Sequence, residues 1–225
     1  MPKKYAKKRV KKTKKVNTFA KNFRMGDYHQ NSLANYNHSY QPSTTLRYLS
    51  NELTLINKGD LLNNRQTNLI YVNNLQYVET LRNTANTTRT LRLMLVALRG
   101  STSSADTVNW GDLLINYQFT KQGLQGEDFD SILRINQDEY EKIYDKTFKI
   151  NGASSGENPA RIINVNIPIK KYVSYAYNST IARKNSLYLI SVVNESAGIA
   201  PSATLVNSER RWTMHYHDVI RSGPI

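Results

Sequence analysis

The chain of 225 residues contains no cysteine. A disulfide framework and a thiolate metal site are therefore excluded, and packing alone has to hold the fold together. Long hydrophobic runs are missing too, because the longest apolar run, Leu93–Leu98, is far shorter than the ~20 residues of a membrane-spanning helix. No apolar stretch follows the cationic N-terminus, so we expect neither a secretory signal nor a membrane partner.

The sequence also lacks the short motifs that mark common active sites. It has no phosphate-cradling GxxxxGK[ST] loop, no GxGxxG fingerprint and no GxSxG nucleophile elbow. His215 and His217 have the i, i+2 spacing of two metal ligands on one strand face, with Asp218 beside them, but no third ligand follows at a diagnostic spacing. We therefore expect no enzymatic activity, no metal and no cofactor.

Two pairs of adjacent acids leave one alternative open. Carboxylate oxygens are hard ligands, so Glu127-Asp128 and Asp138-Glu139 can hold a divalent cation between subunits. The plainer interpretation is that these acids keep polar loops soluble.

Acidic residues are absent from the first 24 residues, which carry 11 of the 31 lysines and arginines. The remainder holds 20 basic side chains (31 − 11) and all 17 acids, so the N-terminal arm supplies +11 of the net charge of +14. Such a block repels itself and buries little apolar surface, so we expect it to be disordered alone and to bind a polyanion. Nucleic acid has the matching charge density, and the binding should be salt-dependent and blind to sequence. The predicted nucleic-acid-binding residues are Lys3, Lys4, Lys7, Lys8, Arg9, Lys11, Lys12, Lys14, Lys15, Lys21 and Arg24.

Residues 25–45 are polar and aromatic, without a helical or a strand period. We interpret them as an extended connector that becomes ordered only against a neighbour or the inner wall of its own domain. Tyr28, Tyr36 and Tyr40 can stack on bases, although packing against protein is the favoured interpretation. The expected organisation is an arm and connector over residues 1–45, followed by one folded domain.

The folded domain, residues 46–225, has the pattern of an all-β protein. A run that is apolar on both faces, Thr90–Arg99, is typical of a strand buried between two layers. Alternation places Tyr71, Leu75 and Tyr77 on one face of their strand, with Ile70, Val72 and Val78 on the other. The predicted strands are 53–55, 70–79, 90–99, 140–150, 163–167, 171–177, 187–193 and 211–217.

One short helix is expected around residues 108–115, and no repeat period is present. Eight strands with connections of unequal length predict a two-sheet β-sandwich, for which the eight-stranded jelly roll is the natural version.

Several segments together resemble one known family. They are PKKYAKKRVKKTKK, KGDLLNNRQTNLIYVNNLQYVETLRN, TLRLMLVALRG, YDKTFKI, the Lys170-Lys171-Tyr172 segment and NSLYLISVVNES. With them the chain resembles the capsid proteins of small circular single-stranded DNA viruses, the circovirus-like proteins and their relatives with rolling-circle replication genes. The resemblance covers nearly the whole chain through loose motifs. It departs from circoviruses proper in the arm, which has nine Lys and two Arg where those proteins tend to use Arg.

The resemblance implies a structural capsid protein that self-assembles into a closed icosahedral shell of 60 copies (T=1). The arm would point inward and package a single-stranded genome, with DNA favoured over RNA. The implied locations are the virion and the host nucleus and cytoplasm, with nuclear import receptors as possible further partners of the arm. Two alternatives remain: the capsid protein of a small satellite-like RNA virus, and a non-assembling cellular nucleic-acid-binding protein with a basic tail.

Cations of the folded domain have two interpretations each. Lys170 and Lys171 either meet the genome from the inner wall of the shell or form a solvated strand end. Three arginines either do the same or pair with Glu79 at an interface: Arg82, Arg89 and Arg92.

Overall fold

The structure is a computed structural model that describes residues 23–41, 48–61, 63–100, 113–115, 133–153, 156, 158–194 and 204–221. These residues form eleven strands: β1 (Phe23–Tyr40), β2 (Tyr48–Glu52), β3 (Leu69–Asn83), β4 (Arg89–Leu98), β5 (Leu114–Ile115), β6 (Arg134–Ile135), β7 (Tyr140–Ile150), β8 (Ala160–Tyr175), β9 (Ala182–Lys184), β10 (Leu187–Val193) and β11 (Val206–Arg221). Within those ranges, no helix is long and apolar enough to cross a membrane.

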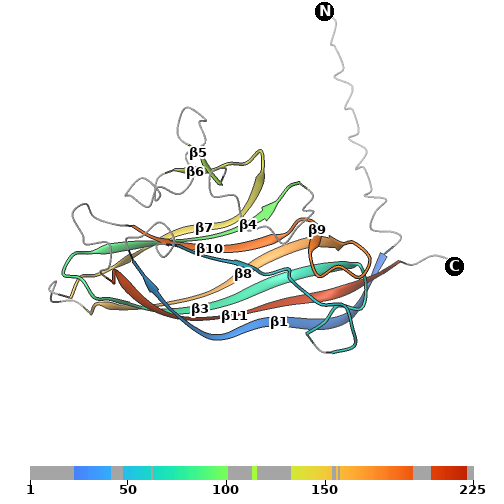
Figure 1. The fold of residues 1–225 in the computed structure, drawn as a ribbon, viewed down its shortest axis with the longest axis horizontal. Coiled ribbons are helices and arrows are strands. Elements are labelled where there is room, and N and C mark those ends of the chain that lie inside the picture. The colour runs from blue at the N-terminus through green and yellow to red at the C-terminus, as the bar shows by residue number, and fades with distance from the viewer. Residues whose placement is uncertain are drawn as a thin grey trace, which may run out of the picture.

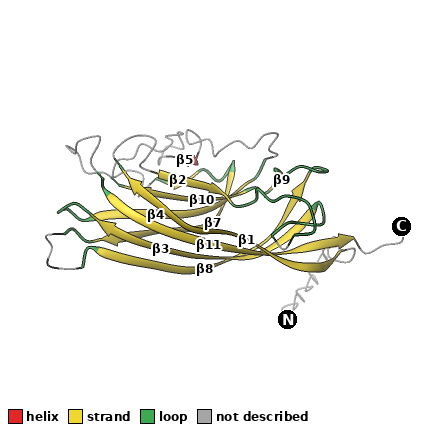
Figure 2. Cartoon of the chain, turned by 60° about the horizontal axis from the view of Figure 1, so that its bottom comes forward, coloured by secondary structure: helices red, strands yellow, loops and turns green. Residues whose placement is uncertain are grey.

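Two antiparallel sheets face each other (Figures 1 and 2). The five-stranded sheet has the order β1-β11-β3-β8-β9, and the four-stranded sheet has the order β2-β10-β4-β7. A two-stranded ribbon, β5-β6, lies beyond the four-stranded sheet (Figure 1).

The strand pairing is nested. β1 pairs with β11, β2 with β10, β3 with β8 and β4 with β7, so the first half of the chain pairs with the second half in reverse order. Two further pairs, β11 with β3 and β10 with β4, join these ribbons into the two sheets. This arrangement is the eight-stranded jelly roll, so the predicted fold class is confirmed.

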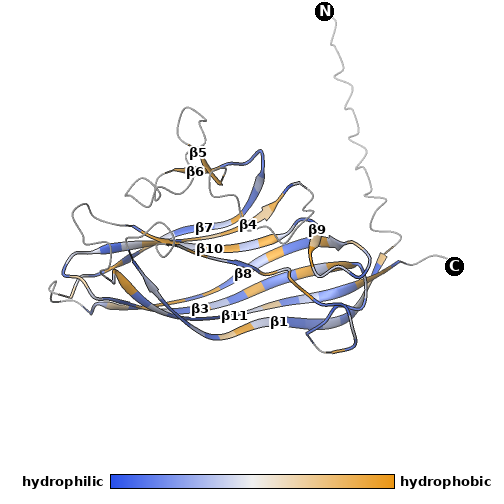
Figure 3. Cartoon of the chain, viewed as in Figure 1, coloured by the Kyte–Doolittle hydropathy of each residue, from blue (hydrophilic) through white to orange (hydrophobic). Residues whose placement is uncertain are grey.

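The hydrophobic core lies between the two sheets. β11 shows the cause, because Trp212, Met214 and Tyr216 alternate with more exposed neighbours and are at most 6% exposed. The same alternation colours the long strands in bands of hydrophilic and hydrophobic residues (Figure 3). These three residues therefore share one face of the predicted strand 211–217, and burial of such apolar faces drives the two sheets together.

A second apolar cluster covers the outer face of the four-stranded sheet. In β4, Leu93 and Leu95 point into the main core, whereas Met94 and Val96 pack against a cluster that includes Leu114 of β5. The prediction that this strand is buried between two layers is confirmed. Among the described residues, the second layer consists of the β5-β6 ribbon with Leu113 and Leu133 beside it.

The connector interpretation of residues 25–45 is corrected by β1. This segment is an 18-residue edge strand, with its register to β11 running from Phe23 opposite Arg221 to Tyr40 opposite Val206. Its inward side carries polar residues such as His29 and Asn31, so no apolar alternation marks this strand in the sequence. The predicted boundary between residues 45 and 46 lies outside the described residues, as does the expected disorder of the arm before Phe23.

A β-bulge at Asn73 overturns the predicted faces of β3. Val72 lies opposite Tyr216 and Asn74 opposite His215, so Asn73 is an extra residue between them. The extra residue inverts the alternation, and Ile70, Val72, Leu75 and Tyr77 are therefore all buried on the same side. A bulge of this kind depends on the partner strand, so periodicity along one strand cannot reveal it.

The two strands predicted at 163–167 and 171–177 are one strand, β8. β8 accommodates Pro168 because β9 begins to pair with β8 only at Ser174, so no strand among the described residues pairs with the outer side of Pro168. Two residues further on, Lys170 has a left-handed backbone (φ 54°) at a register shift opposite the β3 bulge.

Two smaller expectations also change. Residues 53–55 follow β2 rather than form a strand. Of the helix expected at 108–115, residues 108–112 lie outside the described part of the chain, Leu113 is helical, and Leu114–Ile115 form strand β5. The predicted number of strands agrees with the jelly roll only because two missed strands, β1 and β2, are offset by the wrongly predicted strand at 53–55 and by the division of β8 into two.

Candidate nucleic-acid interface

The basic arm joins the sandwich directly. Ten of its predicted contact residues, Lys3 to Lys21, lie outside the described residues. The eleventh, Arg24, is the second residue of β1, exposed and opposite Ile220 of β11. The polycation is therefore continuous in sequence with the edge strand of the five-stranded sheet.

Aromatic rings cross the exposed face of this sheet at the same end. The register places Tyr28 of β1 opposite His217 of β11, His217 opposite Tyr71 of β3, and Tyr71 opposite Tyr172 of β8. The ring centroids of Tyr28 and His217 are 5.3 Å apart, and those of Tyr71 and Tyr172 are 4.9 Å apart. These four residues form a continuous line over four neighbouring strands, which we call the aromatic row.

His215 lies beside the aromatic row. Its ring stacks on Tyr28 at a centroid distance of 5.9 Å, and its Nδ1 is hydrogen-bonded to the Tyr28 hydroxyl. Partial burial lowers the pKa of His215, which favours the neutral ring at physiological pH. His215 and His217 thus share a face as predicted, but both pack against a tyrosine.

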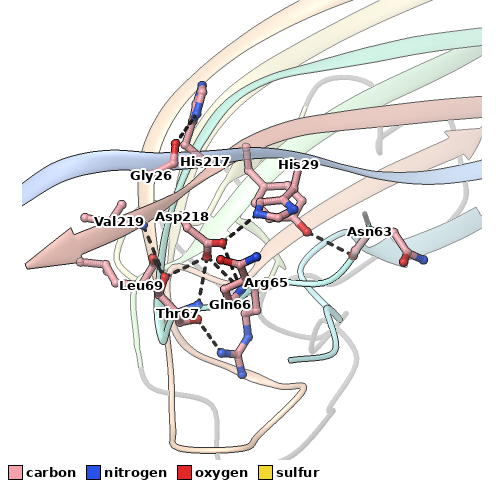
Figure 4. A network of polar contacts seen from close by, with 11 residues as sticks. Gly26, His29, Asn63, Arg65, Gln66, Thr67, Leu69, His217, Asp218 and Val219 are labelled. Atoms are coloured by element: carbon pink, nitrogen blue, oxygen red, sulfur yellow. Dashed lines mark hydrogen bonds and ion pairs between the residues drawn. The ribbon is translucent and has the colours of Figure 1, made fainter. Parts of the chain in front are cut away.

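Asp218 does not join these histidines, because it points to the opposite side of β11. It is 1% exposed and accepts hydrogen bonds from the backbone N–H groups of Gln66 (3.0 Å) and Thr67 (3.1 Å) and from the Thr67 hydroxyl (2.9 Å). His29 Nε2 of β1 lies 2.8 Å from its Oδ2 (Figure 4). The described residues contain no group of three or more His, Cys, Asp or Glu side chains that could hold a metal.

Arg65 anchors the loop between β2 and β3 next to Asp218. Its guanidinium donates to the Thr67 carbonyl (2.7 Å), to Asn68 Oδ1 (3.2 Å) and to the Ser179 carbonyl, and it lies 4.0 Å above the centre of the Tyr175 ring. Arg65 is fully buried, so it serves as a structural anchor and offers no charge to a ligand. Arg65 belongs to the segment KGDLLNNRQTNLIYVNNLQYVETLRN, but nothing in that sequence pattern indicates a buried anchor.

A second buried polar network lies within the core. Glu79, which is 0% exposed, accepts hydrogen bonds from the hydroxyls of Tyr77 (2.6 Å), Ser208 (2.5 Å) and Tyr40 (3.2 Å). Burial, and then the charge of Glu79, raise the pKa of Tyr40 and of Tyr77 far above the ordinary value. Arg210, directly opposite Glu79 in the register, donates to Ser191 (3.2 Å). Glu79 therefore belongs to the buried core of the domain. The alternative in which it pairs with Arg82, Arg89 or Arg92 at an interface is wrong.

The other cations of the folded domain separate into two groups. Lys171 is paired with Glu141 (2.6 Å), and Arg92 holds Asp145 through two hydrogen bonds of 2.8 Å. Arg89 is also buried, whereas Arg82 and Lys170 are exposed and can reach a polyanion.

The tyrosines of β1 differ in what they can contact. Tyr40 is fully buried, so the protein-packing interpretation holds for it, but Tyr28 and Tyr36 are 45% and 41% exposed. Tyr36 lies at the other end of β1, opposite Arg210. Tyr71, Tyr172 and the two histidines were not predicted as interface residues, because their proximity follows from strand register alone.

No family model matches the chain, and no curated protein matches it. Among solved structures, the chain is similar to the empty head of turnip yellow mosaic virus, with 12% identity, a TM-score of 0.35, and coverage of 88% of this chain and 85% of that chain. It is also similar to desmodium yellow mottle tymovirus (10% identity, TM-score 0.32, 89% of this chain, 87% of that chain). A third similar structure is the VP2 subviral particle of infectious bursal disease virus (11% identity, TM-score 0.30, 88% of this chain, 39% of that chain). Likeness at these identities and TM-scores carries no argument about function.

Proposed function

We propose that this protein is a non-enzymatic structural subunit of a viral capsid, and that its Lys-rich arm packages a single-stranded genome inside a homo-oligomeric shell. The observation that carries the proposal is the continuity of the polycation with β1. Ten Lys and Arg precede Phe23, with no acid among them, and Phe23 is already the first residue of the sandwich. A charge block placed this way brings nucleic acid to one particular sheet of the domain.

The distribution of charge supports a shell over a free nucleic-acid-binding protein. The arm has a charge of +11, and the rest of the chain has a net charge of only +3 (20 basic minus 17 acidic residues). A nearly neutral body suits a subunit that meets neighbours and solvent, because large charge of one sign would oppose close association. Arm and body then have separate tasks, packaging and assembly.

The finer proposal is a T=1 shell of 60 copies around single-stranded DNA, as the family resemblance implies. About 60 arms of charge +11 supply on the order of 660 positive charges, which neutralises a large part of a genome of roughly 1–2 kilobases at one phosphate per nucleotide. Lysine is a compact point charge that binds phosphate without base selectivity, so the arm suits packaging without sequence choice.

Electron microscopy of the purified full chain, combined with nuclease treatment, tests this proposal. We expect uniform closed particles whose nucleic acid resists added nuclease and, after extraction, is digested by DNase. If only RNase digests the extracted nucleic acid, the packaged genome is RNA and the DNA part of the proposal is wrong. A monomer or dimer that forms no particles in any buffer would contradict the capsid function and favour a tail-driven binding protein.

A further inference from the structure

The aromatic row has the composition and position of a surface that binds nucleic-acid bases. It consists of four rings, one from each of four neighbouring strands, on the exposed face of the five-stranded sheet. At a strand spacing of about 4.8 Å the row extends over roughly 14 Å. Tyr28 is 45% exposed, and Tyr71, Tyr172 and His217 are partly exposed, so ring surface remains accessible to a ligand.

Cations stand at both ends of the aromatic row. Arg221 is exposed where β11 ends, four residues beyond His217 and on the same face of the strand by alternation. Lys170 and Lys184 are exposed near Tyr172, at the β8–β9 edge. These three positive charges outweigh the exposed Asp27 beside Tyr28. A single strand that crosses the row would therefore find phosphate partners on either side of the rings.

The residues before Phe23 indicate which ligand would bind to the aromatic row. They carry ten Lys and Arg and join β1 five residues before Tyr28, so any polyanion bound by the arm is concentrated at this end of the sheet. A duplex keeps its bases stacked on one another, whereas a single strand offers free base faces, and stacking on aromatic side chains is the common way to bind them without sequence choice.

We propose that the aromatic row is a base-stacking platform for single-stranded nucleic acid that the arm delivers. This rests on the proposed packaging function and adds a second mode of contact to it. The arm neutralises phosphates, and the row stacks bases against the five-stranded sheet. The exposed face of that sheet is then the face turned toward the genome.

The test compares the affinities of the full chain for two probes, oligothymidylate and an abasic oligonucleotide of the same length. Both carry the same phosphates, but only the first can stack. We expect the unaltered protein to bind oligothymidylate on the order of tenfold more tightly. Tyr28→Leu with Tyr172→Leu should remove this preference, while Tyr28→Phe with Tyr172→Phe, which keeps the rings, should retain it.

A matched control places the same apolar residue elsewhere on the same face. Thr80→Leu with Asn164→Leu, both at exposed positions, should leave the ratio of the two affinities unchanged. Replacement of Lys3, Lys4, Lys7 and Lys8 by Gln should lower the affinity for both probes by the same factor.

Each contrary result is distinguishable. Equal affinities of the unaltered protein for both probes, or a preference that survives the leucine substitutions, would overturn the platform and leave packaging by the arm intact. Leucine substitutions that abolish particle assembly without changing the ratio would assign the row to contacts between copies. Arm substitutions that change neither affinity would contradict the proposed function itself.

Discussion

At the scale of single residues, buried polar groups join particular strands of the sandwich through hydrogen bonds. Glu79 accepts hydrogen bonds from Tyr40 at the end of β1, Tyr77 in β3 and Ser208 in β11, so one carboxylate joins three strands of the five-stranded sheet. Tyr40 also makes a hydrogen bond of 2.7 Å to Ser191 of β10, which connects this group to the opposite sheet. Such a network stabilises the fold only while each member has its partner.

Glu79→Ala should lower the free energy of unfolding by about 3–5 kcal/mol, because three buried hydroxyls lose their acceptor. Glu79→Gln keeps the side-chain volume and one acceptor oxygen, so its loss should be smaller, about 1–2 kcal/mol. Urea denaturation of the soluble subunit measures both values.

The matched control for this prediction is Glu209→Ala, at an exposed position of β11 next to Arg210. Its effect should stay within about 0.5 kcal/mol. A Glu79→Ala protein as stable as this control would show that the core does not depend on the carboxylate.

At the scale of elements, close contact between two loops stabilises one end of the sandwich. Asn83 at the end of β3 donates to the carbonyls of Thr87 (2.8 Å) and Asn151 (3.0 Å), and the Ala153 N–H donates to the Ala85 carbonyl (2.9 Å). The β3–β4 loop and the residues after β7 are therefore in direct contact.

Gly152 makes this contact possible. A Cβ at this position would lie 2.0 Å from the Asn86 carbonyl oxygen, and a backbone atom cannot move aside as a flexible side chain can. Gly152→Ala should therefore destabilise the domain by about 1–3 kcal/mol in thermal or urea unfolding.

The comparison is Gly100→Ala, where a Cβ would meet nothing within 4 Å. This second substitution should be close to neutral. Equal stability of the two variants would show that the loops at this end separate without cost.

At the scale of the whole molecule, charge divides the chain into a cationic arm and a nearly neutral body. Each arm lysine that neutralises a phosphate of a single strand contributes about −0.7 to the slope of log affinity against log salt. Replacing Lys11, Lys12, Lys14 and Lys15 by Gln should therefore reduce the magnitude of that slope by about 3. Titration of an oligonucleotide at several salt concentrations measures it.

The control removes the same number of charges from exposed lysines of the body. Replacing Lys58, Lys142, Lys146 and Lys149 by Gln should leave the slope of log affinity against log salt unchanged. An equal reduction in both variants would show that the body binds phosphate as strongly as the arm, and the division of tasks would be wrong.

Several features could be predicted from the sequence because they depend on local composition or on periodicity within one strand. The absence of acids makes the arm recognisable without any structure. Strands β4, β7 and β10 agree with their predictions within one residue at each end. Trp212, Met214 and Tyr216 show their common face by alternation alone.

Other features depend on pairs of strands that are distant in the sequence. The bulge at Asn73 exists only relative to β11 and β8, so the faces of β3 were wrongly predicted. β1 was missed because its inward side carries polar residues, such as His29 and Asn31, whose partners come from other elements.

By itself, the sequence determined the all-β class, the neutral body and the cationic arm, because composition and period act on each segment independently of the others. Tertiary structure alone decided which rings stand together, because Tyr28, Tyr71, Tyr172 and His217 are brought into one row only by the register of four strands. It likewise decided that Glu79 and Asp218 are buried among hydrogen-bond donors, where a carboxylate is stable only if folding supplies those partners.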